Sequence, residues 1–440
     1  MAGASLAAVV MAGGLGTRMR SATPKHLHPI LGRRMVDWVL EAARPLGPDP
    51  LVVIASPESR GEFGANPVAV QEQALGTGDA VRSARAAVGE SADNVLVLSG
   101  DTPLLTTELL EALVTEHERE GAAATVLSFI PGDARSYGRI VRGQDGTVEG
   151  IVEAGDATPE QLAIQECNSS IYVFCAELLW PALDRLEPHN VQGELYLTDA
   201  VRDLVARGER VVAHVAADPA ETEGVNTRVE LAAAASTLRD RINREHMLAG
   251  VGITDPGSTW IEPQVTIEAD AVILPFTVLR GTTSVATGAE VGSHVVAIDA
   301  EIGPGATVGP FCYLRPGTVL GPRAKAGAFV EIKKSTIGQD TKVPHLSYIG
   351  DAEIGEGTNI GAGSITANFP HRPGQPKGKT TIGSNVRVAV DTMFVAPVTV
   401  GDDAWTAAGT VVTDDVPDNT LAGFPPRQVN KEGRGGKRDD

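Results

Sequence analysis

The chain has 440 residues, too many for one ordinary hydrophobic core, so two or three domains are expected. Apolar residues make up 42% and charged residues 21% of it, which is typical of globular proteins. The formal net charge of −19 argues against nucleic acid and anionic membranes as partners, because both would repel the chain at long range. A phosphate-bearing substrate would therefore need local cations or a metal ion in its pocket.

Two further features exclude other classes of protein. The apolar run at residues 6–12 is shorter than the ~20 residues that cross a bilayer, and no basic residue precedes it as in a secretory signal. Cys167, Cys175 and Cys312 lack the spacing of a metal-binding or redox motif, and we interpret them as packing residues in a reducing compartment. We therefore expect a cytoplasmic protein.

The first half of the chain alternates short β-branched runs with helical stretches. The expected strands cover residues 6–12, 51–56, 94–101, 124–130, 169–175 and 210–216, and the expected helices cover 35–47, 79–88, 106–121 and 195–208. This alternation predicts a Rossmann-like α/β domain over residues 1–227, with a mostly parallel sheet covered by helices on both faces. Ligands of such sheets usually bind beyond the carboxyl ends of the strands.

Residues 228–250 are rich in alanine and arginine and contain no proline, which predicts one linking helix. Beyond it, large apolar residues recur, mostly with a six-residue step and once, before Ile354, with a five-residue step. They are Ile261, Ile267, Ile273, Leu279, Val285, Val291, Ile302, Val308, Leu314, Leu320, Val343, Ile349, Ile354, Ile360, Ile382, Val388, Phe394 and Val400. This period is typical of the hexapeptide repeat of a left-handed parallel β-helix, in which each aliphatic side chain stacks on the one a coil below. Residues 251–440 are expected to form this domain, with a loose tail from residue 427.

Glycines follow three of these aliphatic residues directly, at Gly303, Gly309 and Gly321. We expect them to permit the tight turns at the corners of the coils.

A glycine-rich turn, GGLGTRM at residues 13–19, follows the first expected strand, and Lys25 comes shortly after it. Backbone N–H groups in such a turn approach phosphates closely, and Arg18 and Lys25 add positive charge. The glycine spacing alone is equally compatible with a purely structural turn. Asp101 is the last residue of the strand expected at 94–101, a position from which its carboxylate would ligate Mg²⁺. The alternative is that Asp101 caps the N-terminus of the helix expected at 106–121.

Longer motifs make the pattern more specific. GGLGTRM…PK resembles the signature of sugar-1-phosphate nucleotidyltransferases, and QEQALGTG, SGD, YGR, IVE, QGELYLTD and EGVNTR follow it in order between residues 71 and 228. With the β-helix, these motifs resemble the family of bifunctional N-acetylglucosamine-1-phosphate uridylyltransferases/glucosamine-1-phosphate acetyltransferases over nearly the whole chain. The resemblance implies Mg²⁺-dependent transfer of UMP from UTP to N-acetylglucosamine-1-phosphate in the first domain. It also implies acetylation of glucosamine-1-phosphate by acetyl-CoA in the second, for UDP-N-acetylglucosamine and peptidoglycan synthesis.

The resemblance also implies roles for particular residues of the first domain. Arg18 and Lys25 would neutralise the reacting phosphates, Asp101 and Asn226 would share Mg²⁺, and the substrates would contact Ala12, Gly13, Gly14, Gln71, Gly76, Thr77, Gly138, Glu153, Asn168 and Asn226. By the same resemblance, the uracil would contact Gln71, Gly76 and Thr77. The sugar subsite would be lined by Gly138, Glu153 and Asn168. Ser170 stands where the family has glycine, and we expect it to narrow the sugar subsite.

In the second domain, PHLSYIGDAEIGEGTNIGAG, LRPG and FVEIKKS resemble the acetyltransferase site. A single histidine on a β-helix is more often an exposed residue without a function. An imidazole, with its ordinary pKa near 6.5, nevertheless suits a general base. The resemblance implies this role for His345, with Glu331 orienting its ring. Glucosamine-1-phosphate would be held by Arg315, Lys333, Tyr348 and Asn359, and acetyl-CoA by Ala362, Asn368, Phe369, Val390, Ala408 and Arg427.

Three residues depart from the family on the acetyl-CoA side. Phe369, Val390 and Pro425 are apolar where the family has polar groups, and each lost hydrogen bond costs about 0.5–1.5 kcal/mol. We therefore expect weakened acetyl-CoA binding. The resemblance further implies a homotrimer, in which the loop at residues 368–379 reaches a neighbouring chain.

Two alternatives remain open at this point. One is a nucleotidyltransferase with a single activity, whose β-helix only assembles the oligomer. The other is an assembly protein without catalysis, against which the presence of Arg18, Lys25, Asp101 and Asn226 speaks.

Overall fold

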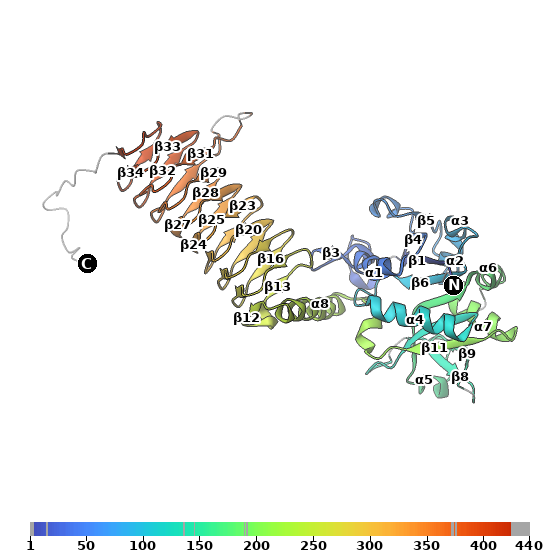
Figure 1. The fold of residues 1–440 in the computed structure, drawn as a ribbon. Coiled ribbons are helices and arrows are strands. Elements are labelled where there is room, and N and C mark those ends of the chain that lie inside the picture. Colours follow the sequence, from blue (N-terminus) through green and yellow to red (C-terminus); the bar gives the residue numbers. More distant parts are fainter. Residues whose placement is uncertain are drawn as a thin grey trace, which may run out of the picture. The chain divides into compact units, whose positions relative to one another are not determined.

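The computed structural model describes residues 4–423 except 15, 135–136, 145, 189, 191, 371–373 and 375, so Pro425 and Arg427 lie outside the described residues. The chain divides into two compact units between Leu238 and Arg239 (Figure 1). Within the described residues, no helix combines the length and the apolar character needed to span a lipid bilayer.

The first unit is built around a mixed sheet with the strand order β11-β7-β10-β6-β1-β4-β5. These strands are β1 (Leu6–Ala12), β4 (Leu51–Ala55), β5 (Val68–Val70), β6 (Asn94–Ser99), β7 (Ala124–Phe129), β10 (Cys167–Cys175) and β11 (Val211–Val215). β1 pairs in parallel with β4 and β6, whereas β10 runs antiparallel between β6 and β7. The predicted Rossmann-like α/β sheet is confirmed, with one reversed strand among these seven.

Helices cover both faces of this sheet, as predicted. α1 (Met35–Ala43) and α4 (Thr107–Glu120) share one apolar core, and α2 (Thr77–Ser83), α6 (Ala176–Asp184) and α7 (Leu197–Ala206) share the other. Because successive strand residues point to opposite faces, Val9 lies in the second core and Val10 in the first. Burial on both faces explains why these strands are almost continuously apolar.

Smaller elements complete the first unit. The remaining helices are α3 (Arg85–Val88) and α5 (Pro159–Leu162), and the remaining strands are β2 (Pro29–Ile30), β3 (Arg33–Arg34), β8 (Arg139–Arg142) and β9 (Val148–Val152). Short 3-10 helices are η1 (Thr17–Met19), η2 (Lys25–Leu27), η3 (Arg44–Leu46), η4 (Arg60–Glu62) and η5 (Pro219–Thr222). The β8–β9 hairpin and α6 had no counterpart in the sequence prediction.

The helix predicted at 228–250 is α8 (Arg228–Leu248). Glu230 Oε2 accepts hydrogen bonds from the backbone N–H groups of Asn226 (2.7 Å) and Thr227 (2.9 Å), which satisfies donors at the start of the helix. The helix thereby holds the backbone of Asn226 in place.

In the second unit, short parallel strands stack in three faces of a β-helix, as predicted (Figure 1). The first face contains β12 (Gly252–Ile253), β15 (Val272–Ile273), β18 (Glu290–Val291), β21 (Thr307–Val308), β24 (Lys325–Ala328) and β27 (Lys342–His345), and bridges at Asn359 and Arg387 continue it to β34 (Trp405–Thr406) and β36 (Leu421–Ala422). The second contains β13 (Trp260–Ile261), β16 (Val278–Arg280), β19 (Val296–Ile298), β22 (Tyr313–Leu314), β25 (Glu331–Lys333), β28 (Tyr348–Gly350), β30 (Ile365–Ala367), β32 (Met393–Val395) and β35 (Val411–Val412). The third contains β14 (Thr266–Ile267), β17 (Ser284–Val285), β20 (Ala300–Ile302), β23 (Thr318–Leu320), β26 (Ser335–Ile337), β29 (Ala352–Ile354), β31 (Thr380–Ile382) and β33 (Val398–Val400), and η6 (Pro256–Ser258) lies between β12 and β13.

The hexapeptide residues form the core of these coils. All of those named above are buried except Ile267, which is half-buried because it lies on the first strand of its face. The glycines that follow these residues are required for two different reasons. Gly309 has a φ of +99°, whereas a Cβ on Gly303 would lie 2.5 Å from the backbone oxygen of Leu320 in the next coil. Close stacking, as well as turning, therefore requires glycine here.

Candidate active sites

The glycine-rich turn of the first unit lies at the carboxyl end of β1, next to the carboxyl end of β6. Gly16 has a φ of +59°, and a Cβ at this position would overlap the side chain of Lys25. The turn therefore approaches Lys25, which lies on η2 and is 8% exposed.

Four predicted residues from distant parts of the chain meet beside this turn. Asn226 Oδ1 accepts hydrogen bonds from Lys25 Nζ (2.7 Å) and from Arg18 Nη2 (2.8 Å). Lys25 also forms an ion pair with Asp101, whose Oδ1 accepts a hydrogen bond from Ser99 Oγ (2.6 Å). The N-cap of α4 is Thr106, whose hydroxyl accepts from Leu109 N, so Asp101 is not needed as a helix cap.

The charges of this cluster depend on its burial. Burial would raise the pKa of Asp101, but the positive charge of Lys25, together with hydrogen bonds from Lys25 and Ser99, outweighs it and holds the pKa below its usual value. Burial lowers the pKa of His26 to about 4, so this imidazole is neutral near pH 7. Asp101 is therefore an anion between a cation and a neutral ring.

These oxygen donors suit a divalent cation. The Asp101 carboxylate and Asn226 Oδ1 both contact the ammonium group of Lys25, so two oxygens of the kind that Mg²⁺ prefers converge on one positive charge. A hollow of about 220 Å³ beside them is lined by Arg18, Ser99, Asp101, Thr102, Tyr137, Ser169, Ser170, Gly224, Asn226 and Glu230. Phosphate oxygens and water would complete the coordination there.

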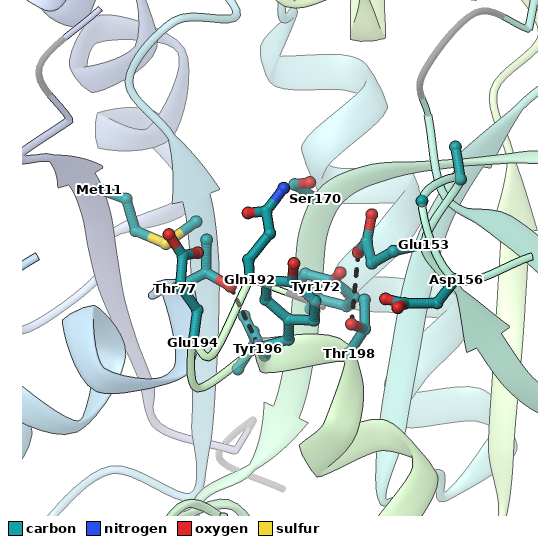
Figure 2. A pocket seen from close by; sticks show the side chains of 13 residues that line it. Met11, Thr77, Glu153, Asp156, Ser170, Tyr172, Gln192, Glu194, Tyr196 and Thr198 are labelled. Carbon is teal, nitrogen blue, oxygen red and sulfur yellow. Dashed lines mark hydrogen bonds between the residues drawn. The ribbon is translucent and has the colours of Figure 1, made fainter. Parts of the chain in front are cut away.

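A second hollow of about 440 Å³ lies between β1, β10 and α7 (Figure 2), lined by Met11, Thr77, Glu153, Ala154, Gly155, Asp156, Ser170, Tyr172, Gln192, Glu194, Tyr196, Leu197 and Thr198. Glu153 accepts a hydrogen bond from Thr198 Oγ1 (3.3 Å), and burial raises the pKa of this carboxyl. Asn168 Nδ2 donates to Tyr172 Oη (2.7 Å), and Gly138 packs against Glu153. Carboxylates, hydroxyls and an aromatic ring in one pocket suit a sugar.

Ser170 lines both hollows. It lies at a β-bulge between Asn168 and Ile171, with a φ of +64° that residues other than glycine rarely adopt. A side chain at this position therefore lies at the border of the two hollows.

The residues predicted to bind uracil form a third group. Gln71 Nε2 donates to the carbonyl of Gly76 (3.0 Å) and to Asp79 Oδ2 (3.1 Å), and Thr77 Oγ1 accepts from Leu197 N (3.0 Å). Gly13 lies within reach of Gln71, close to the end of β4. Ala12, Gly13 and Gly14 therefore lie between this group and the cluster of Lys25 and Asp101.

The second unit gathers cations on its second face. Arg315 Nη1 donates to Glu331 Oε1 (2.8 Å), and Glu331 is aligned with Tyr348 one coil further on. Lys377 lies beside Lys333, and it lowers the pKa of Lys333. Within the described residues Glu331 makes no hydrogen bond to His345, so in this single chain the expected orienting contact is replaced by the pair with Arg315.

His345 lies at the end of β27 on the first face, where a corner at Leu346 and Ser347 separates it from Tyr348 on the second face. Asn359 is on the first face, aligned with Lys342 and Arg387. The two predicted sugar ligands Tyr348 and Asn359 therefore lie on different faces of the same coil stack.

Three of the predicted acetyl-CoA residues continue from His345 along one edge. Lys342, Asn359, Arg387 and Trp405 are aligned on successive coils. His345, Ala362, Val390 and Ala408 each come three positions after one of these residues. They therefore form a second aligned series, in which the three predicted acetyl-CoA residues stack above His345. Asn368 is buried and donates to Asp351, whereas Phe369 is 74% exposed. Arg427 lies outside the described residues.

The fold and these two sites define a transferase with a nucleotidyltransferase unit and a β-helix unit. Residues 8–133 match the model of the MobA-like NTP transferase domain. The bifunctional protein GlmU of Streptomyces coelicolor is 49% identical over 453 residues, covering 97% of this chain and 93% of that protein. The bifunctional protein GlmU of Mycolicibacterium vanbaalenii is 47% identical over 455 residues, covering 97% and 92%.

This chain belongs to the GlmU family of bifunctional enzymes. It is a uridylyltransferase and an acetyltransferase, the two activities that the sequence resemblance implied. The match spans both units, so the interpretation of the β-helix as a mere assembly device is set aside.

Several residues of these sites were missed in the sequence. Ser99, Thr198 and Gln192 lie inside the quoted motifs SGD and QGELYLTD, and their contacts give them roles. His26 and Lys377 carried no signal, because a single histidine or lysine has no pattern of its own.

Proposed function

We propose that the first unit transfers UMP from UTP to N-acetylglucosamine-1-phosphate with Mg²⁺ held by Asp101 and Asn226. The observation that carries this proposal is the convergence of Asp101, Asn226, Lys25 and Arg18 beside the glycine-rich turn. When bound, Mg²⁺ supplies positive charge to the phosphate oxygens. The uracil lies against Gln71, Gly76 and Thr77. The sugar lies in the pocket lined by Glu153, with Asn168 and Gly138 next to it.

The reaction requires positioning more than covalent chemistry. An oxygen of the sugar phosphate attacks the α-phosphorus of UTP, the bond to the bridging oxygen breaks, and pyrophosphate leaves with its electron pair. Arg18 and Lys25 stabilise the negative charge that develops on the phosphates, and the buried position of Lys25 increases its effect. Glu153 and Asn168 hold the sugar so that its phosphate faces this cluster.

The second unit, in the same proposal, acetylates glucosamine-1-phosphate. Arg315, Lys333 and Lys377 suit the phosphate, and His345 takes the proton from the 2-amino group as its nitrogen attacks the thioester carbonyl of acetyl-CoA. The thiolate of CoA leaves and is protonated. Because Tyr348 and Asn359 lie on different faces, a complete site needs a second chain, which supports a homotrimer with sites between subunits.

The decisive experiment measures pyrophosphate release from UTP and Mg²⁺ with a panel of sugar-1-phosphates, with and without acetyl-CoA. N-acetylglucosamine-1-phosphate should be a substrate alone, and glucosamine-1-phosphate should become one when acetyl-CoA is added. Asp101→Ala should abolish nucleotidyl transfer and leave acetyl transfer intact. Normal Mg²⁺-dependent turnover in this variant would disprove the metal assignment.

Light scattering tests the assembly. A trimer should have a mass near three times the 45.8 kDa of the chain. A monomer that acetylates glucosamine-1-phosphate would contradict the shared site.

A further inference from the structure

One column of the first β-helix face carries cationic, amide and aromatic side chains on successive rungs. Lys342, Asn359, Arg387 and Trp405 are aligned on successive rungs, and this set is called the Lys342–Trp405 column below. Lys342 and Arg387 are exposed, and Trp405 is 58% exposed. A stripe with two cations, an amide and an indole is unusual on a chain whose net charge is −19.

The cation at the centre of this column is not neutralised by the protein. Within the described residues, no carboxylate forms an ion pair with Arg387, whereas Arg323 on a nearby coil is paired with Asp340 at 2.7 Å. A guanidinium with five donors and no partner is suited to bind a phosphate. Trp405 on the next rung offers a flat surface on which a nucleobase stacks.

The column runs beside the edge on which His345 lies. Ala362, Val390 and Ala408 stack above His345 three positions after the members of the column, and Gly361, Ala389 and Ala407 lie between the two lines. Small residues therefore separate the line above His345 from the column. A narrow, flexible arm fits there better than a bulky group.

The rung spacing gives the length that a ligand must have. Adjacent rungs are ~4.8 Å apart, so Arg387 lies about 10 Å and Trp405 about 14 Å along the stack from the rung of His345. In acetyl-CoA, an arm with two amide groups joins the thioester to a diphosphate, and when extended it spans about 15 Å, like four residues of extended chain. Arg387 and Trp405 also lie three residues, or about 10 Å, across the face from the line of His345, so their straight-line distances from it are about 14 Å and about 17 Å. A thioester at His345 with its arm running obliquely across the face therefore places the diphosphate near Arg387 and the adenine near Trp405.

We propose that Arg387 and Trp405 form the binding site for the phosphate and adenine end of acetyl-CoA. This proposal rests on the proposed acetyltransferase function and adds two residues to it. Arg387 binds the phosphates and Trp405 stacks on the adenine, while the arm runs obliquely from His345 past Ala362 and Val390 towards the column. The charge of Arg387, on the same rung as Val390, compensates for the polar contact that valine cannot make.

The direction of the ligand provides a matched control. Lys325 is aligned with Lys342 on the opposite side of the His345 rung, so a cofactor that extends towards Trp405 does not reach it. Lys325→Ala removes one exposed cation from the same face and should leave acetyl-CoA kinetics unchanged. Arg387→Ala should raise the KM for acetyl-CoA about tenfold, the loss expected for a charge-assisted hydrogen bond, with kcat and the KM for glucosamine-1-phosphate unchanged.

Three further measurements sharpen the test. Arg387→Lys should recover most of the affinity, and Trp405→Ala should weaken binding of adenosine 3′,5′-bisphosphate measured by calorimetry. Added salt should raise the KM for acetyl-CoA in the wild type and much less in Arg387→Ala. Light scattering should give the same mass for all variants.

Contrary results are distinguishable. Unchanged acetyl-CoA binding in Arg387→Ala, or an equal loss in Lys325→Ala, overturns this site while leaving the acetyltransferase proposal intact. A lower mass in Arg387→Ala also overturns it, because Arg387 would then be a contact between chains. A wild-type protein that binds no acetyl-CoA refutes the proposed acetyl transfer itself, and this site with it.

Discussion

Replacing Lys25 by methionine tests whether an ammonium group occupies the position of the metal ion. Lys25 Nζ contacts the Asp101 carboxylate and lies 2.7 Å from Asn226 Oδ1, and both oxygens are the metal ligands that we propose. Mg²⁺ must therefore displace the ammonium from them before it binds. Lys25→Met keeps the length of the side chain and removes this competition, so the variant should bind Mg²⁺ more tightly than the wild type.

The size of the effect follows from the burial of the pair. Moving a unit charge from about 3 Å to about 6 Å from a carboxylate costs about 3 kcal/mol at an effective dielectric constant near 20. The side chains of Lys25 and Asp101 are only 10% and 15% exposed, so solvent screens little of this. We expect a gain in Mg²⁺ affinity of between about tenfold and a hundredfold. Uridylyl transfer should fall by orders of magnitude in the same variant, because the charge on the phosphates is no longer neutralised.

Calorimetric titration of Mg²⁺ without substrates gives the affinity, and pyrophosphate release gives the rate. Lys325→Met, in the other unit, is the control and should change neither. Asp101→Asn should lose Mg²⁺ binding. If Lys25→Met binds Mg²⁺ no better than the wild type, the ammonium does not compete with the metal, and the proposed overlap of the two sites is wrong.

Three further predictions concern other parts of the chain. Burial lowers the pKa of His117 from 6.5 to about 4, so the unfolded state binds more protons than the folded state between these pH values. The free energy of unfolding, measured with urea, should therefore fall by about 2 kcal/mol between pH 7 and pH 5. A His117→Gln variant whose free energy of unfolding depends on pH in the same way would contradict this. Ser170→Gly relieves the strain of a residue with a φ of +64° and widens the sugar pocket. The kcat/KM for N-acetylglucosamine-1-phosphate should therefore rise relative to that for glucose-1-phosphate. An unchanged ratio of the two values would show that Ser170 does not contact the sugar. His345→Ala should abolish acetyl transfer and spare uridylyl transfer, and Val390→Ser should lower the KM for acetyl-CoA; unchanged binding would mean that Val390 does not face the cofactor.

Much of the fold was predictable because its signals are local. The six-residue step of aliphatic residues identified the β-helix, since each coil repeats the same short pattern and stacks on its neighbour. The apolar runs of β1 and β6 identified two strands of the first sheet, and the run without proline at residues 228–250 identified α8. The motifs around Lys25 and Asp101 indicated phosphate chemistry from residue type and order.

The tertiary structure decided which distant residues meet. Lys25 and Asn226 are separated by 201 positions, and no local pattern predicts that one oxygen of Asn226 binds both Lys25 and Arg18. The reversed strand β10 places Ser170 between two hollows, a position that depends on a bulge and on pairing with two other strands.

In the second unit, a loop between Asn359 and Arg387 breaks the repeat, so only the observed register shows that they share a column with Trp405. By itself, therefore, the sequence determined the two folds, the family resemblance and the types of residue at each site. Only the tertiary structure decided the contacts among those residues, because hydrophobic periodicity specifies which face of an element is buried and not which element packs beside it.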